Sequence, residues 1–334
     1  MIKPIVIAEV GVNHNGKLHL AKKLISIASK AGADYVKFQT YKTENLVSKN
    51  SSSAEYQKKN LKGNISQFKM LKKYELSRID HEKLIYQCKK KSIRFISSPF
   101  DIESIDLLIS LKIEIIKVPS GEINNVPYLQ HLGKFKKKII LSTGMSKLKE
   151  IKNALQILIN AGTPKKNITV LHCTSEYPTH FDSANLNTIS YLKKKLKCSI
   201  GFSDHTIGSL ASVIAVNLGA EIIEKHITLN NNMDGPDHKA SLQTSQLFEF
   251  INQLKSIKKI LGSKKKIITR KEKQNSIHIR KSIFAKTHIL KGQKFSKKNL
   301  ITLRPGKFIA ASQWNKLLNK KTKFNFKSGD PIRV

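Results

Sequence analysis

The chain has 334 residues, of which 40% are hydrophobic and 25% are charged, and its formal net charge is +38. This composition excludes a disordered chain, and no apolar run approaches the 18 or so residues of a membrane span. The first carboxylate is Glu9, too early for the apolar region of a signal peptide, so we expect a cytoplasmic protein. Three cysteines without CxxC spacing predict reduced thiols, not a disulfide framework or a zinc knuckle.

The positive charge has two explanations. A nucleic acid or an anionic membrane could be the partner, or lysines could simply decorate a solvated surface. The lysines form short scattered runs, and aromatic residues make up only 7% of the chain. We therefore favour the surface explanation and expect neither a nucleic-acid nor a membrane partner. The alternative is a non-catalytic barrel that binds polyanions with strongly salt-dependent affinity.

Short β-rich runs alternate with segments of helical period along the chain. The expected strands are Ile5–Ala8, Tyr35–Phe38, Phe95–Ser97, Ile115–Val118, Ile139–Ser142, Thr169–His172, Ser199–Phe202 and Ile222–His226. The expected helices are Leu18–Ala31, Gln67–Leu76, His81–Lys91, Glu103–Leu111, one near Pro127, Lys147–Asn160, Leu186–Leu196, Gly208–Leu218 and Thr244–Leu261. Eight strand–helix units in about 260 residues predict an α/β fold of the (β/α)8 (TIM) barrel type. A doubly wound open sheet is the alternative, but no GxGxxG follows the first strand.

The pattern changes after Gly262. A polar connector leads to about Arg280, and beyond it we expect short strands at Lys281–Lys286, His288–Leu290 and Leu300–Leu303. The predicted organisation is therefore a barrel at 1–263, a linker at 264–279 and a small β-rich domain at 280–334. A domain of that size has little core of its own and should dock onto another surface.

Polar side chains close nearly every expected strand, where the reactive residues of such barrels lie. His205 and His226 close neighbouring strands, which run about 4.8 Å apart. Two imidazoles so placed can meet at one divalent ion, with nitrogens about 2.1 Å from it, and leave positions open for substrate and water. Imidazole with oxygen ligands suits Mn²⁺ or Mg²⁺. The alternative is that each histidine is a hydrogen-bonded core residue.

Two lysines, Lys37 and Lys117, stand inside short apolar strands, where a cation is costly to bury without an anion. Together with the hydroxyls of Ser120, Ser142 and Ser203 they predict a cradle for phosphate and carboxylate groups. The alternatives are lysines that reach outward to solvent between the helices, or one lysine that forms a Schiff base.

Three other residues have two interpretations each. Glu9 is either a general base for water or the ion-pair partner of a lysine. Asp237, in the turn Gly235–His238, either holds sugar hydroxyls or is an exposed acid. Cys173 cannot form a dyad with His172, because consecutive strand residues point to opposite faces, and we assign it to the core.

Taken together, the motifs of the chain resemble those of the bacterial sialic acid (N-acetylneuraminate) synthase family, which includes legionaminic acid synthases. The matching stretches are Ala8–Gly16, Lys37–Thr40, Ala54–Gln57, Ser98–Asp101, Pro119–Glu122, Ser142–Met145, Gly201–His205, Glu224–His226 and Gly235–His238. Ala285–Lys286 and Arg304–Gly306 resemble the C-terminal antifreeze-like (SAF) domain of that family.

The resemblance implies condensation of phosphoenolpyruvate with an N-acylated mannosamine-type sugar and water, which gives a nonulosonic acid such as N-acetylneuraminate and phosphate. The alternative acceptor is 2,4-diacetamido-2,4,6-trideoxymannose, the substrate of a legionaminic acid synthase. It implies a metal, Mn²⁺ before Mg²⁺ or Co²⁺, on His205 and His226, with Glu9 as acid and base. It implies phosphoenolpyruvate on Lys37, Lys117, Ser120, Ser142 and Ser203, and sugar contacts from Tyr177, Asp237, Ser175 and Arg304. Finally, it implies a domain-swapped homodimer in which Arg304 of one SAF domain reaches the sugar in the partner's barrel.

Overall fold

The computed structural model describes residues 4–49, 51 and 66–334. The matching stretch Ala54–Gln57 therefore lies outside the described residues. The chain divides into two compact units, Met1–Leu261 and Gly262–Val334. No helix of the described residues is both long and apolar enough to cross a membrane.

The first unit is built on a closed barrel of eight parallel strands. These are β1 (Ile5–Gly11), β2 (Tyr35–Thr40), β3 (Arg94–Pro99), β4 (Ile115–Val118), β5 (Lys138–Ser142), β6 (Ile168–Cys173), β7 (Ser199–Asp204) and β8 (Ile222–His226). Each strand pairs with the next, and β8 closes the sheet on β1, with Ile5 opposite Ile222. All eight expected strands are confirmed, and closure of the sheet rules out the doubly wound alternative.

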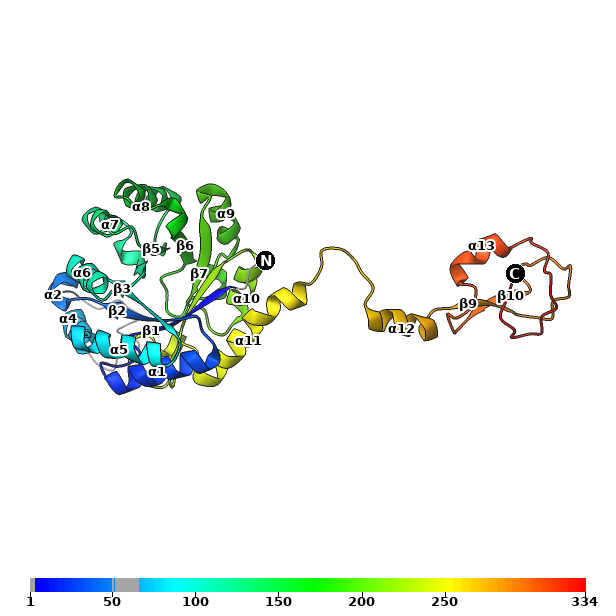
Figure 1. Cartoon of the computed structure of the whole chain (residues 1–334), viewed down its shortest axis with the longest axis horizontal. Coiled ribbons are helices and arrows are strands. Elements are labelled where there is room, and N and C mark those ends of the chain that lie inside the picture. Colours follow the sequence, from blue (N-terminus) through cyan, green and yellow to red (C-terminus); the bar gives the residue numbers. More distant parts are fainter. Residues whose placement is uncertain (1–3, 50, 52–65) are drawn as a thin grey trace. The chain divides into compact units, whose positions relative to one another are not determined.

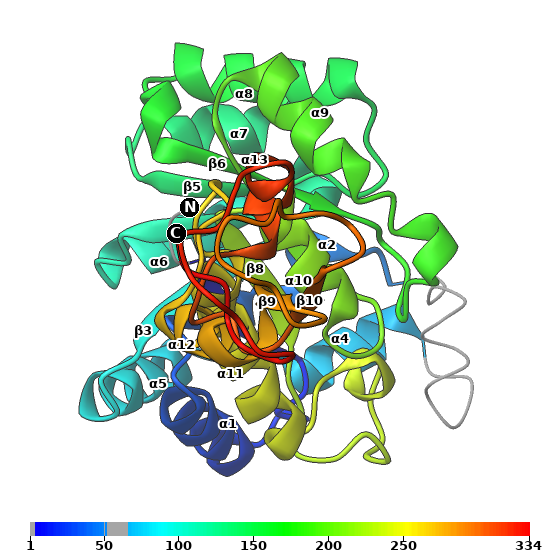
Figure 2. The ribbon, with the colours of Figure 1, turned by 90° about the vertical axis from the view of Figure 1, so that its right-hand side faces the viewer.

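Helices surround these strands on the outside (Figures 1 and 2). They are α1 (Leu18–Ala31), α5 (Arg78–Lys90), α6 (Ile102–Ser110), α7 (Val126–Gly133), α8 (Leu148–Asn160), α9 (Asn187–Leu196), α10 (Leu210–Asn217) and α11 (Thr244–Leu261). Two further helices, α2 (Thr43–Leu46) and α4 (Gln67–Tyr74), belong to the connection between β2 and β3 and contact each other. In α1, Ala21, Leu24, Ile25 and Ala28 form the buried stripe, at the spacing of one helical face. The helix ends at Gly32, whose left-handed φ of 85° favours glycine.

Two layers of side chains fill the lumen of the barrel. The lower layer is apolar and consists of Ile7, Tyr35, Ile96, Ile140, Leu171 and Ile222. Side chains two residues apart share a face of a strand, so the residue two positions further along each of these strands also points inward. Those residues are polar, as Glu9 follows Ile7 and Lys37 follows Tyr35. The apolar layer is thus the floor of a polar site at the carboxyl ends of the strands.

The second unit holds α12 (Arg270–Ile279), β9 (Ser282–Ala285), β10 (Leu300–Leu303) and α13 (Trp314–Leu317). The two strands are antiparallel, with Leu300 opposite Ala285. They pack on a small core whose buried members include Ile289, Phe295 and Phe326. The two strands β9 and β10 confirm two of the three expected runs in this part of the chain.

The structure adds one helix to this unit and contradicts one expected strand. The segment 264–279 contains a helix, α12, which begins with a capping box between Thr269 and Glu272. The run His288–Leu290 is not a strand: it makes only an isolated bridge, from Ile289 to Phe326. Its alternation reflects a core residue, Ile289, in a segment that turns immediately afterwards at Gly292, where φ is 90°.

Candidate functional site

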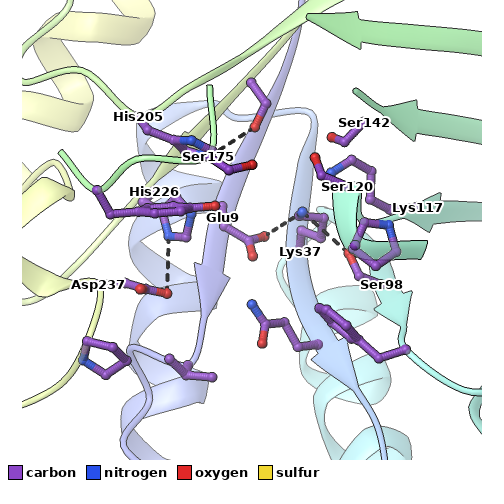
Figure 3. A pocket seen from close by; sticks show the side chains of 18 of the residues that line it. Glu9, Lys37, Ser98, Lys117, Ser120, Ser142, Ser175, His205, His226 and Asp237 are labelled. Atoms are coloured by element: carbon purple, nitrogen blue, oxygen red, sulfur yellow. Dashed lines mark hydrogen bonds and ion pairs between the residues drawn. The ribbon is translucent and has the colours of Figure 1, made fainter. Parts of the chain in front are cut away.

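A cavity of about 460 Å³ opens at the carboxyl ends of the barrel strands. Eleven of the twelve side chains that the sequence singled out line it: Glu9, Lys37, Lys117, Ser120, Ser142, Ser175, Tyr177, Ser203, His205, His226 and Asp237. Ten of the cavity's side chains are labelled in Figure 3. Arg304, the twelfth, is an exposed residue of the second unit, directly after β10, and its contact with a sugar stays a prediction.

Strand register brings these residues together from distant parts of the chain. Glu9 on β1 lies opposite Lys37 on β2 and, on its other side, opposite His226 on β8. Ser203 on β7 lies opposite Glu224 on β8. Gly11 allows the close approach at the end of β1, because an added Cβ would lie 3.1 Å from Glu9 Oε1 and its φ is +51°.

A buried ion network crosses the cavity. The carboxylate of Glu224 lies between two ammonium groups, with Oε2 3.0 Å from Lys37 Nζ and Oε1 3.2 Å from Lys117 Nζ. Ser203 Oγ donates a hydrogen bond of 2.8 Å to Glu224 Oε1. Lys37 Nζ also lies 3.4 Å from Glu9 Oε2 and from Ser98 Oγ (Figure 3). The positive charges of both lysines are therefore compensated by carboxylate groups inside the barrel.

Burial moves the pKa values of these groups in different directions. Burial raises the pKa of Glu9 to about 8, although the ammonium of Lys37 opposes this. Burial would also raise the pKa of Glu224, but Lys117 and Lys37 outweigh it and hold that pKa well below its usual range. Burial lowers the pKa of Lys117, against the attraction of Glu224. Glu9 is therefore the carboxyl group that holds a proton near neutral pH, while Glu224 is ionised.

The two lysines do not reach outward to solvent, as one alternative held: Lys37 is 4% and Lys117 is 3% exposed. The contact with a lysine that one interpretation of Glu9 required is present, with Oε2 3.4 Å from Lys37 Nζ, and the acid–base role of that residue stays a prediction. The hydroxyls of Ser120 and Ser142 line the same cavity, and Ser120 Oγ accepts a hydrogen bond of 3.0 Å from the backbone N–H of Gly144. The cation and hydroxyl groups of the expected cradle are thus in one place.

The two histidines face each other across adjacent strand ends, with ring centroids 5.6 Å apart. His205 Nδ1 lies 2.6 Å from the carbonyl oxygen of Thr174, a contact in which the ring N–H donates and Nε2 is left with its lone pair. Among the described residues, no hydrogen-bond partner reaches the buried Nδ1 of His226, which lies 3.9 Å from Asp237 Oδ2. Burial lowers the pKa of His205 to about 4 and holds the pKa of His226 well below its usual value. Both rings are therefore neutral at pH 7.

These observations fit a divalent cation. Imidazoles bound to one ion at about 2.1 Å have ring centres at most about 6.5 Å apart, and the observed 5.6 Å meets this limit. A buried ring nitrogen without a hydrogen bond is expected where an ion or a ligand completes the site. Within the described residues no group of three or more His, Cys, Asp or Glu side chains is arranged to hold a metal. The sequence predicted a site with two histidine ligands and several open positions, and metal binding there stays a prediction.

Two other predicted residues border the histidines. The ring of Tyr177 lies 4.1 Å from that of His205, centroid to centroid. Asp237 is buried rather than exposed, and burial raises the pKa of its carboxyl group to about 7. The loop that carries Asp237 is held by Asn13, whose amide donates to Ser241 Oγ (2.8 Å), while Ser241 Oγ donates to the carbonyl oxygen of Asp237 (2.7 Å).

Cys173 is buried, as expected of a core residue, but it lines the cavity, with Sγ 3.3 Å from Ser120 Oγ. Cys173 follows the floor residue Leu171 by two positions, so it shares the inward face of β6 and belongs to the site. His172 faces away, stacked on Phe202 and hydrogen-bonded to the carbonyl oxygen of Ala184. The two residues therefore form no dyad, as predicted.

Neither Glu224 nor Ser98 was assigned a role from the sequence, although both stood in stretches noted for their polar residues. Glu224 precedes His226 by two positions, so both share the inner face of β8. That spacing, with two buried lysines in need of an anion, was the signal that could have identified it. Its partners lie on β2 and β4, and only closure of the barrel brings them within reach.

The fold and the site define a class: a (β/α)8-barrel enzyme with a charged pocket at the carboxyl ends of its strands. Residues 24–266 match the model of the NeuB family. An N,N'-diacetyllegionaminic acid synthase of Campylobacter jejuni is 48% identical over 100% of both chains. A protein of the same name from Legionella pneumophila is 40% identical, over 98% of this chain and 92% of that one.

A solved structure gives the same result. The N-acetylneuraminic acid (sialic acid) synthetase of Leptospira borgpetersenii, in complex with citrate, superposes with a TM-score of 0.72 at 32% identity. The match covers 82% of this chain and 90% of that one. The chain belongs to the NeuB family.

Proposed function

We propose that this enzyme condenses phosphoenolpyruvate with an N-acylated mannosamine-type sugar and water to give a nonulosonic acid and phosphate. The observation that carries the proposal is that eleven side chains, chosen for that chemistry, line one cavity. Two ammonium groups can meet the phosphoryl and carboxylate groups of phosphoenolpyruvate, and the neutral histidines face the same space.

The acceptor is the finer part of the proposal. The sequence left N-acetylmannosamine and 2,4-diacetamido-2,4,6-trideoxymannose open. The relatives at 48% and 40% identity are both named N,N'-diacetyllegionaminic acid synthases, and each match covers at least 92% of both chains. They favour the 6-deoxy diacetamido sugar as the acceptor, with N-acetylmannosamine as the second candidate.

The residues of the chain supply binding charge and proton transfer. Lys37 and Lys117 attract the anionic groups of phosphoenolpyruvate, while Glu224 keeps both lysines in place. Carbon 3 of phosphoenolpyruvate attacks the aldehyde carbon of the open-chain sugar, and the protonated carboxyl group of Glu9 gives its proton to the aldehyde oxygen. The Glu9 carboxylate then takes a proton from the water that adds at carbon 2. In the resulting tetrahedral centre the bond from carbon 2 to the phosphate oxygen breaks, the hydroxyl proton passes to the departing phosphate, and a keto group remains. Glu9 ends the cycle protonated, as it began.

The proposal includes a divalent ion, Mn²⁺ before Mg²⁺ or Co²⁺. His205 and His226 would hold it, as their neutral rings and the buried Nδ1 of His226 support. When bound, such an ion supplies Lewis-acid polarisation of a carbonyl oxygen. The residues of the chain orient that carbonyl: Tyr177 packs on the His205 ring and Asp237 closes the side next to His226.

We also propose a homodimer in which the second unit acts as the SAF domain and Arg304 reaches the sugar bound by the partner. The two-stranded sheet β9–β10 is consistent with such a domain, and Arg304 follows β10 directly and is exposed. We also propose the cytoplasm as the location of the enzyme, and its three cysteines without CxxC spacing support this proposal.

The decisive assay measures phosphate release from phosphoenolpyruvate with each acceptor in turn, with and without Mn²⁺. We expect turnover to depend on the metal and the diacetamido sugar to give the higher kcat/KM. His226→Ala should abolish the metal-dependent release, while His131→Ala, at a residue that bonds to Asp106 and does not line the cavity, should retain it. Unchanged turnover in His226→Ala would remove this residue from the metal site.

A further inference from the structure

A second buried ion pair lies directly behind the two histidines. Asp204 and Lys225 are cross-strand neighbours on β7 and β8, with Oδ2 3.0 Å from Nζ, and their side chains are 0% and 1% exposed. Each immediately precedes one of the histidines, so each points to the opposite face of its strand. Neither lines the cavity, and neither can touch a substrate there.

The pair also holds the backbone on both sides of His205. Asp204 Oδ1 accepts hydrogen bonds from the backbone N–H (2.8 Å) and the hydroxyl (2.7 Å) of Thr206. Lys225 Nζ donates to the carbonyl oxygen of Thr206. Asp204 Oδ2 accepts a further hydrogen bond of 2.6 Å from Ser212 Oγ on α10. Asp204 and Thr206, which flank His205, are thus both bonded to Lys225, the residue before His226.

We infer that Asp204 and Lys225 are positioning residues that set the spacing between His205 and His226. The ammonium group of Lys225 binds Asp204 and Thr206, the two neighbours of His205 at the end of β7. Lys225 itself directly precedes His226 on β8. Displacement of either strand end would change the distance between the rings and would break several buried polar contacts at once. This inference rests on the proposed metal role of the two histidines. Groups outside the ligand shell that fix the position of a metal ligand strengthen binding of the ion. Here Asp204 and Lys225 act through the backbone that carries the two histidines.

The test uses a double variant, Asp204→Asn with Lys225→Met, which removes both charges and leaves no uncompensated ion in the interior. The matched control is Glu221→Gln with Lys193→Met, which removes an exposed pair of the same unit, also 3.0 Å long. Binding of Mn²⁺ to the full-length protein without substrates is measured by calorimetric titration. Hydrogen exchange of segments 203–207 and 224–228 is measured without metal.

We expect Mn²⁺ to bind about 10- to 100-fold more weakly to the double variant, with wild-type affinity in the control. Exchange should become faster in the two segments and remain unchanged elsewhere in the barrel. Lys225→Arg, which keeps the cation, should restore part of the affinity. Wild-type Mn²⁺ affinity in a folded double variant would overturn the inference, as would faster exchange spread over the whole unit.

Two further outcomes are decided in advance. Should the double variant not fold, Ser212→Ala removes one contact to Asp204, and wild-type Mn²⁺ affinity in that variant would overturn the inference. Should the wild-type protein bind no Mn²⁺, the proposed metal site fails, and hydrogen exchange alone judges the positioning role. Unchanged exchange in both segments would then overturn it.

Discussion

Replacement of Glu224 by glutamine tests the charge balance of the cavity. The substitution keeps the shape of the side chain and removes the carboxylate that lies 3.0 Å from Lys37 and 3.2 Å from Lys117. Loss of one partner from a buried ion pair costs about 3–5 kcal/mol, because the remaining charge has no compensation. At about 2–4 °C per kcal/mol for a unit of this size, the melting temperature should fall by about 6–20 °C.

The matched control is Glu221→Gln, three residues earlier, where the ion pair with Lys193 is exposed and worth about 0–1 kcal/mol. Thermal unfolding followed by circular dichroism compares both variants with the wild type. Phosphoenolpyruvate should raise the melting temperature of Glu224→Gln by more than that of the wild type, because its anionic groups replace the missing charge. Equal melting temperatures for the two variants would show that the buried network does not stabilise the barrel.

Three further predictions concern other parts of the molecule. Gly11→Ala should reduce kcat at least tenfold, because its Cβ would lie 3.1 Å from Glu9 Oε1 and 3.4 Å from His226 Cε1 at a φ of +51°; steady-state kinetics at full activity would contradict this. Burial lowers the pKa of His14 from 6.5 to about 4, so the unfolded chain binds this proton more readily than the folded protein does. The contribution of His14 to the free energy of unfolding is therefore complete above pH 6.5 and is lost as the pH falls towards 4. Denaturant unfolding should show a loss from this group of about 2 kcal/mol between pH 7 and pH 5, which His14→Gln removes; an identical pH dependence in that variant would exclude this cause. If Arg304 acts on the partner's site, mixing inactive Arg304→Ala and His226→Ala proteins should restore about a quarter of wild-type activity through mixed dimers, and no restoration would place Arg304 elsewhere.

The sequence was a good guide where one strand decides the outcome. The expected strands Ile115–Val118 and Ile222–His226 are the observed strands β4 and β8 to the residue, because each begins with a pair of β-branched isoleucines, the residue type that strands favour. The polar residues that close the strands are likewise found in one cavity, since parallel strands of a barrel end at the same rim.

The sequence did not predict interactions between strands that are far apart along the chain. Glu224 binds lysines on β2 and β4, and that geometry follows from closure and tilt of the barrel rather than from any local pattern. The buried position of Asp237 depends in the same way on packing between the loops after β1 and β8. In the second unit, one buried residue, Ile289, imitated a strand because alternation over three residues is too short to separate pairing from packing.

The apolar floor of the lumen has a consequence for how reactants come and go. Ile7, Tyr35 and their neighbours plug the barrel one pleat below the charged groups, so the described cup has a sealed base. Both substrates, water and the released phosphate would then have to pass through the opening at the carboxyl ends of the strands. Whichever reactant arrives first then obstructs the route of the next, and order of addition becomes a property of the barrel itself.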